Sequence, residues 1–144
     1  MAIVNLPAYT QLAGRMPLWA GKNCYYDGDF TSPGNLCNDN TGTAAVGMAV
    51  NQYIRVYYPT PMEAQNYRQF GNINNTGDGR YTLEYMGLDG AWHVWDTLIP
   101  VRVTADWGGL VAPLGGIILI AIRLTVSVLD TAGGNSINEL DIRY

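Results

Sequence analysis

The chain has 144 residues, the size of one ordinary domain, and 48% of them are hydrophobic while only 14% are charged. This composition excludes a disordered chain and predicts one buried core. With a net charge of −4 and a single lysine, Lys22, the chain has no basic cluster for nucleic acid or for an anionic membrane surface. We therefore expect neither nucleic-acid binding nor membrane insertion.

The first 50 residues are rich in Gly, Asn, Thr and Pro, which favour turns over regular elements. We expect residues 1–50 to wrap the domain as an irregular segment with one or two edge strands. The chain starts without a basic residue and a long apolar stretch, so no secretory signal is expected and synthesis would be cytoplasmic. Two interpretations of Cys24 and Cys37 stay open, a disulfide that closes a small loop or two buried thiols.

From residue 51 onward the abundance of Tyr, Val, Ile and Thr favours strands. Gln52–Tyr58 is the first predicted strand, and Pro59 and Pro61 are expected to end it because proline cannot donate to a strand ladder. A second strand is predicted over Ala64–Phe70. The Asn- and Gly-rich segment Gly71–Gly79 is expected to form an exposed loop.

Arg80–Met86 and Ala91–Leu98 flank an Asp-Gly turn, which is the pattern of a β-hairpin. Because the predicted strands are short and no helix lies between them, the sequence predicts an all-β antiparallel sandwich or barrel. We expect a single β-sandwich domain over residues 1–144, with its main strands in residues 51–144. The remaining predicted strands are Pro100–Thr104, Ile117–Val128 and Ile137–Tyr144, separated by loops over Asp106–Gly116 and Asp130–Ser136.

Three segments in a fixed order resemble the discoidin or coagulation-factor type C family and its related carbohydrate-binding modules. Tyr26–Thr31 is similar to the early Asp-Gly loop of that family, and Tyr81–Tyr85 with Asp89–Trp92 looks like its central hairpin. Ile122–Leu124 and Ser136–Ile142 resemble its closing strands. The tryptophan that the family places soon after the early threonine is missing here. The resemblance implies a discoidin-like, galactose-binding-domain-like jelly roll.

The resemblance also implies a structural calcium ion between the early loop and the last strand. Its ligands would be Asp27 and Glu139 by side chain, Asp29 and Asn138 by carbonyl, and Thr31 or Ser32 by hydroxyl. Calcium prefers such an all-oxygen set. A second interpretation stays open, in which Asp27 belongs to a plain turn and Glu139 faces solvent or pairs with an arginine.

Family members bind glycans on loops at one end of the sandwich, where an aromatic ring stacks on a sugar and polar side chains bind its hydroxyls. By that resemblance, and because exposed rings on rigid loops suit recognition, the candidate ligand-binding residues are Trp19, Asn38, Trp107 and Asn135. Anchoring of its own loop is the other interpretation of Trp107, since tryptophan is usually well buried.

No nucleophile elbow, phosphate-binding loop or metalloprotease motif is present, so we expect no enzymatic activity. The first expected function is a non-catalytic carbohydrate or cell-surface binding module within a bacteriophage virion, in its tail, baseplate or capsid decoration. The second is a purely structural virion assembly protein. Few surface charges suit contacts with other virion proteins, so an oligomer or a larger assembly is expected.

Overall fold

The computed structural model describes residues 10–11, 25–37, 40–111 and 116–143. Within these ranges the regular elements are β-strands and one short 3-10 helix, η1, at Pro33–Cys37. The strand pairs are antiparallel. No helix in this part of the chain is long and apolar enough to cross a membrane. The predicted all-β antiparallel fold is confirmed.

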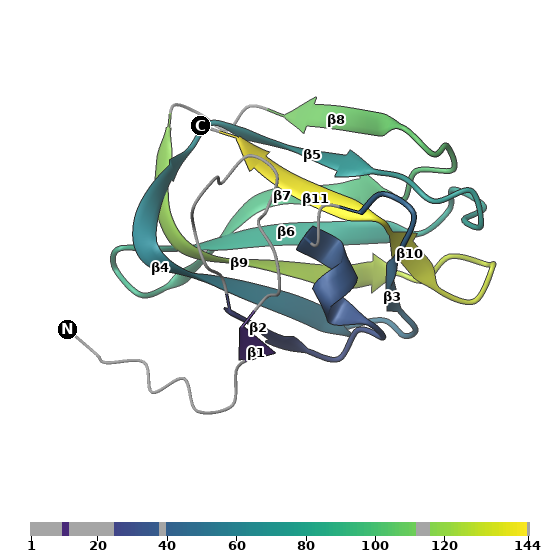
Figure 1. The fold of residues 1–144 in the computed structure, drawn as a ribbon, viewed down its shortest axis with the longest axis horizontal. Helices are drawn as coiled ribbons and strands as arrows, with labels where there is room; N and C mark the ends of the chain where they lie inside the picture. The colour runs from purple at the N-terminus through teal and green to yellow at the C-terminus, as the bar shows by residue number, and fades with distance from the viewer. Residues whose placement is uncertain (1–9, 12–24, 38–39, 112–115, 144) are drawn as a thin grey trace.

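The larger sheet has six strands in the order β1-β2-β4-β9-β6-β7 (Figure 1). Its central strand pairs join β9 to β4 on one side and to β6 on the other. The bounds of its strands are β1 Thr10–Gln11, β2 Tyr25–Gly28, β4 Tyr53–Ala64, β6 Arg80–Gly87, β7 Trp92–Pro100 and β9 Ile117–Val128.

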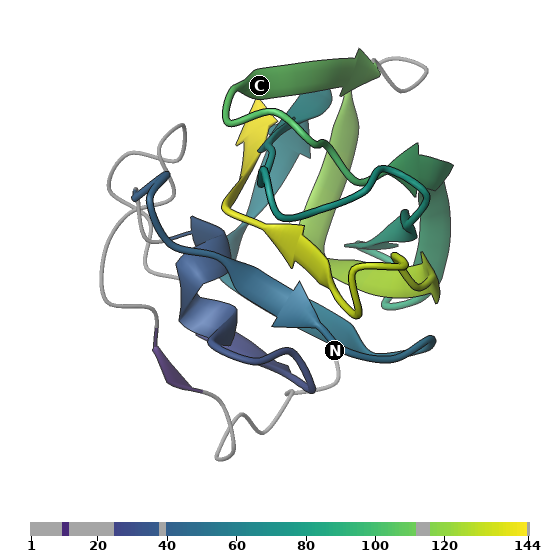
Figure 2. The ribbon, with the colours of Figure 1, turned by 90° about the vertical axis from the view of Figure 1, so that its right-hand side faces the viewer.

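Two smaller sheets form the second layer, across the core from the larger sheet (Figures 1 and 2). One has three strands in the order β11-β5-β8, and the other pairs β10 with β3. The bounds of these strands are β3 Ala45–Gly47, β5 Asn66–Phe70, β8 Trp107–Val111, β10 Asn135–Ile137 and β11 Glu139–Arg143.

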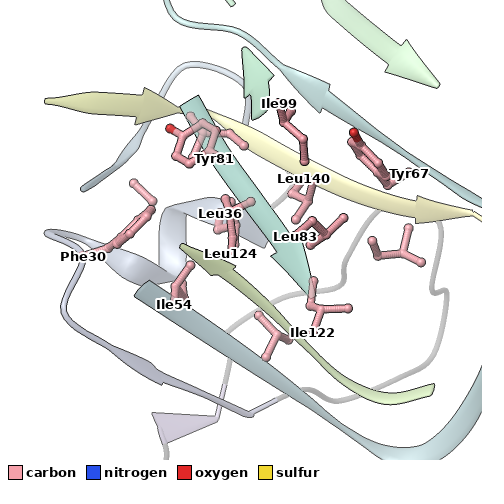
Figure 3. Packing of buried hydrophobic residues seen from close by; sticks show 14 of the residues in the cluster. Phe30, Leu36, Ile54, Tyr67, Tyr81, Leu83, Ile99, Ile122, Leu124 and Leu140 are labelled. Carbon is pink, nitrogen blue, oxygen red and sulfur yellow. The ribbon is translucent and has the colours of Figure 1, made fainter. Parts of the chain in front are cut away.

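Alternation along the central strands creates the core between the layers. On β9, Ile122 and Leu124 are buried while Arg123 and Thr125 face outward and stay partly exposed, as expected when successive side chains point to opposite faces. The inward side chains pack against Leu140 of β11 and against further buried residues of both layers (Figure 3).

The predicted hairpin and the long predicted strand are both present. β6 and β7 pair across a turn in which Gly90 adopts a φ of 76°, a conformation that glycine adopts without strain. β9 spans the predicted residues, Ile117–Val128. The predicted loop over residues 71–79 is also confirmed.

The prediction that Pro59 and Pro61 end a strand is wrong. β4 continues to Ala64, and its pairing with β9 shifts register between Tyr57 and Met62. The two prolines lie inside this irregular stretch. Because the regular hydrogen bonds between the strands are interrupted there, the N–H group that proline lacks is not needed for pairing.

Two predictions between β7 and β9 are also wrong. Residues 101–106 form a loop rather than a strand, because their backbone bonds reach the two ends of loop 71–79 and no strand: Val101 N–H donates to the Gly79 carbonyl and the Arg102 carbonyl accepts from Asn72 N–H. Trp107, expected in a loop, starts strand β8 and pairs with Phe70 of β5.

The last predicted strand is divided in two at Asn138. Its N–H donates to the Phe70 carbonyl, and there the chain passes from the two-stranded sheet to the three-stranded sheet. Because β10 begins at Asn135, the preceding loop ends at Gly134, two residues earlier than predicted.

Candidate functional site

Three loops meet at one end of the sandwich, which we call the loop end. They are residues 71–79 between β5 and β6, residues 101–106 between β7 and β8, and residues 129–134 between β9 and β10. Figure 2 views the molecule from this side. Loops on a rigid scaffold commonly carry binding residues, so this end is the first place to look for a site.

Asn75 joins loop 71–79 to loop 101–106 and to strand β10 from a buried position. Its Nδ2 donates to the Arg102 carbonyl at 3.0 Å and to the Ser136 carbonyl at 2.8 Å, and its Oδ1 accepts from Ser136 N–H at 3.0 Å. One amide therefore satisfies backbone groups of two neighbouring segments, which holds loop 71–79 in place.

Asp130 is the second buried organiser of the loop end, with 1% of its surface exposed. Its carboxylate accepts backbone N–H bonds from Thr76, Gly77 and Ala132 and a bond from the Thr76 hydroxyl. Burial alone would raise the pKa of Asp130, but these hydrogen bonds outweigh it and hold the pKa well below its usual range. Asp130 is thus ionised and ties two loops together.

The contact between loops 71–79 and 101–106 requires glycine at position 71. A Cβ added there would lie 2.3 Å from the Thr104 carbonyl oxygen and 2.4 Å from the Arg102 Cβ. Gly71 N–H donates to the Asp106 carbonyl at 3.1 Å. The two backbones approach this closely because residue 71 has no side chain.

A shallow depression of 260 Å³ lies where these loops meet the 40–43 turn. The Asn72 amide donates to Asn138 Oδ1 at 2.8 Å, and Asn138 Nδ2 donates to the Thr41 carbonyl at 2.6 Å. The apolar Ile73 is 71% exposed at its rim. We call this the amide depression, and its lining residues are Gly42, Gly71, Asn72, Ile73, Asn74, Ala105 and Asn138.

The predicted ligand-binding residues do not gather in the amide depression. Trp19 and Asn38 lie outside the described residues, as does Cys24, so the two interpretations of Cys24 and Cys37 both stay open. Asn135 is fully buried, and its amide is used within the chain: Oδ1 accepts from Asp130 N–H, and Nδ2 donates to the Arg80 and Val128 carbonyls. It supports the loop end from beneath and offers no surface to a ligand.

Trp107 has the contacts of an anchor. The Arg68 guanidinium lies 3.8 Å from the centre of its ring, and Phe70 packs edge-on at 5.3 Å. Arg68 in turn donates from Nε to the buried Asp141 carboxylate at 2.7 Å. One face of the indole is therefore occupied by the protein itself, although the ring remains partly exposed.

The residues implied for calcium lie on separate elements. The Asp27 carboxylate pairs with the Arg55 guanidinium, with Nε to Oδ1 at 2.8 Å. Thr31 bridges to Val46 of β3, whose other side pairs with Ser136 of β10. β3 thus lies between the early loop and the start of the closing strands. Asp29, also implied as a ligand, is exposed and donates its N–H to the Tyr53 carbonyl.

Glu139 is fully buried and accepts a hydrogen bond from Asn40 N–H at 2.7 Å. The described ranges contain no group of three or more His, Cys, Asp and Glu side chains arranged to hold a metal. Asp27 does not fit an ion as it stands because both of its oxygens contact Arg55. The calcium site stays a prediction.

Sequence patterns did not single out the residues that build the loop end. Asn72, Asn75 and Asp130 were part of turn-forming segments, and composition alone cannot distinguish a buried organiser from a solvated turn residue. The one available signal was the density of Asn and Gly in residues 71–79 and 130–136.

No protein-family model matches the sequence, and a comparison with curated proteins finds no match. Solved structures do match. A family 32 carbohydrate-binding module of AlyQ, in complex with 4,5-unsaturated mannuronic acid, has a TM-score of 0.69 and 13% identity over 83% of this chain and 93% of its own.

Two further modules are similar. A pectin-binding carbohydrate-binding module has a TM-score of 0.69 and 10% identity over 83% of this chain and 88% of its own. The family 32 module of NanJ from C. perfringens, in complex with galactose, has a TM-score of 0.65 and 15% identity over 81% and 92%. At such identities the likeness concerns the fold. The chain has the discoidin-like, galactose-binding-domain jelly-roll fold found in family 32 carbohydrate-binding modules.

Proposed function

We propose that this protein is a non-catalytic carbohydrate-binding module whose ligand lies in the amide depression. The observation that carries the proposal is a depression lined by asparagine side chains on loops that buried polar groups hold in place. Solved structures with this fold include modules in complex with galactose and with an unsaturated mannuronic acid, and a pectin-binding module.

The depression suits a sugar by its chemistry. Ile73 offers an exposed apolar surface to the C–H face of a pyranose, and the exposed Asn74 offers an amide to its hydroxyls. On the adjoining loop, Arg102, Thr104 and Asp106 form a network of donors and acceptors, with Thr104 Oγ1 to Asp106 Oδ1 at 2.7 Å. A few placed polar groups beside an apolar contact are typical of small-ligand sites.

Binding without catalysis is consistent with the place of His93. Its Nε2 lies 2.8 Å from Asp89 Oδ2 and its ring stacks on Tyr85 at 5.2 Å, near the β6–β7 turn. That turn is at the opposite end of the sandwich from the loop end (Figure 1). The chain's single histidine is therefore remote from the amide depression.

The proposal is tested by calorimetric titration with galactose and by a glycan array. Replacing Ile73 and Asn74 together by alanine should weaken binding about tenfold, because an apolar contact and a hydrogen bond are lost. The matched control is Leu88→Ala, which removes a side chain that is 65% exposed in the β6–β7 turn. Absence of binding to any glycan at millimolar concentration would refute the proposal.

Assembly into a virion or another complex is the second candidate. Large apolar side chains are exposed around the loop end, including Met48 at 53%, Ile73 at 71% and Val103 at 45%, and exposed apolar groups favour contacts with other proteins. Light scattering coupled to size exclusion separates the two functions. A stable oligomer that dissociates in an Ile73→Asp, Val103→Asp double variant would support assembly, and a monomer at high concentration would contradict it.

The implied calcium ion is tested separately by thermal unfolding. A bound ion must raise the melting temperature in millimolar calcium relative to excess chelator, and Glu139→Gln should abolish that rise. Identical melting temperatures in the two conditions would contradict the calcium prediction and leave the sugar proposal intact.

A further inference from the structure

The outer face of the larger sheet carries a row of four charged side chains, which we call the charged ladder. The register pairs Asp27 of β2 with Arg55 of β4, Arg55 with Arg123 of β9, and Arg123 with Glu84 of β6. Directly paired residues lie on the same face of a sheet. The four side chains therefore cross four neighbouring strands in one line.

These side chains point away from the core. Their chain neighbours Ile54, Leu83 and Ile122 are buried at 1% exposure or less, whereas Arg55 and Arg123 keep about a quarter of their side-chain surface exposed, 25% and 27%. Partly exposed ion pairs contribute little to folding stability. The core that closes the sandwich does not require the ladder.

The ladder is held in a defined geometry. Arg123 donates to both Glu84 oxygens, at 2.6 Å from Nε and 2.8 Å from Nη2, and its guanidinium lies 4.6 Å from the centre of the Trp92 ring. Tyr57 packs edge-on against Trp92 at 6.5 Å. Bidentate and stacked guanidinium groups lose little further freedom when they bind a ligand.

A depression of 320 Å³ adjoins the ladder on this face. Four of its lining residues carry a hydroxyl group, namely Tyr53, Thr82, Thr125 and Ser127, and Glu84 and Arg123 form its edge on the ladder side. The guanidinium of Arg55 lies 4.9 Å from the centre of the Tyr53 ring. The volume falls within the roughly 300–1,000 Å³ of small-ligand sites.

We propose that this face is a second ligand-binding surface and that its ligand is an uncharged oligosaccharide. Hydroxyls, a carboxylate and guanidinium groups alternate across it, so donors and acceptors are available together, as sugar hydroxyls require. The two arginines and two carboxylates cancel in charge, and the chain carries −4 overall. This balance favours a neutral glycan over a uronate polymer, which would meet net repulsion. The surface shares no residue with the amide depression and does not depend on it.

The proposal is tested by titrating isotope-labelled protein with cellohexaose, mannohexaose and xylohexaose, each to about 10 mM to reach weak affinities, with hexagalacturonate as the anionic comparison. Amide shifts of Tyr53, Thr82, Thr125 and Ser127 should move with at least one neutral hexamer. Thr125→Arg, which fills the depression, should weaken that binding about tenfold or more. Tyr53→Ala, which removes one wall, serves if the first variant does not fold.

The controls separate this surface from the loop end. The Ile73→Ala, Asn74→Ala variant should leave the sheet-face shifts and their affinity unchanged. Shifts confined to residues 71–75 would overturn this inference while supporting the proposed function, and stronger binding of hexagalacturonate than of every neutral hexamer would overturn the choice of ligand. No shift on β4, β6 and β9 with any of the four probes would refute the surface altogether.

Discussion

The loop end and the outer sheet face both present polar side chains, but different forces hold them in place. At the loop end the polar groups are themselves structural: Asp130 and Asn75 are buried and satisfy backbone groups of neighbouring loops. On the sheet face the strand ladders and the apolar core fix the backbone, and Arg123 and Glu84 are added to its surface. Substitution of a polar side chain should therefore affect stability strongly at the loop end and weakly on the sheet face.

The largest effect is expected for Asp130→Ala. The substitution leaves the backbone N–H groups of Thr76, Gly77 and Ala132 without their acceptor, which should lower the free energy of unfolding by about 3–5 kcal/mol at about 1–3 kcal/mol for each unsatisfied group. Urea denaturation measures the change. A loss below about 1 kcal/mol would show that water replaces the carboxylate and that the loop end is not organised as described.

Acid should also remove the contribution of the Asp130 carboxylate to the free energy of unfolding. Because the folded pKa of Asp130 is depressed below the unfolded value, its stabilisation is fully present above about pH 4 and is lost as the pH falls further. Asp78 on the neighbouring loop 71–79 also has a lowered pKa, through the N–H of Thr131, so the comparison of wild type with Asp130→Asn isolates Asp130. Parallel acid-unfolding curves for the two proteins would contradict this assignment.

A smaller loss is expected for Gly71→Ala. The new methyl group would collide with the Thr104 carbonyl, and relief of the clash must separate loops 71–79 and 101–106. Overpacking of this kind costs about 1–3 kcal/mol. The control is Gly90→Ala, where no atom lies within 4 Å and only the positive φ opposes the change. Equal losses at the two positions would mean that the loops adapt freely.

The smallest effect is expected for Glu84→Ala on the sheet face. The side chain is 17% exposed and its partner Arg123 reaches solvent, so the free energy of unfolding should fall by about 0–1 kcal/mol. The same denaturation experiment compares it directly with Asp130→Ala. A loss as large as that of Asp130→Ala would erase the contrast between the two regions and make the ladder a structural element.

Much of the fold could be predicted from the sequence because the relevant signals are local. The Asp-Gly turn with its flanking strands, and the long apolar run of β9, both appear where expected. The strand boundaries that the sequence predicted wrongly depend on tertiary contacts. β4 passes Pro59 and Pro61 because its register with β9 shifts there, and Trp107 joins a strand because β5 offers it a partner. Neither partner is visible from the residues of one segment.

The candidate site was far less predictable than the fold. Composition indicated that Asn135 and Asn75 lie near turns, but only their neighbours decide that both are buried and support the loops. The charged ladder likewise combines residues from four strands that are distant in the chain. In the sequence, polar and aromatic residues alternate with apolar ones at Tyr53, Arg55 and Tyr57. This alternation indicates the outer face of one strand, but it does not show which residues of other strands lie beside it.

The sequence by itself determined that this chain forms short antiparallel strands around one apolar interior, because strand propensity, alternation and turn residues act within a few positions of one another. The tertiary structure decided which strands adjoin, and hence which polar side chains meet. Register is set by the packing of the whole sheet: a shift by one residue would turn Arg55 and Arg123 into the core and leave no ladder on the surface.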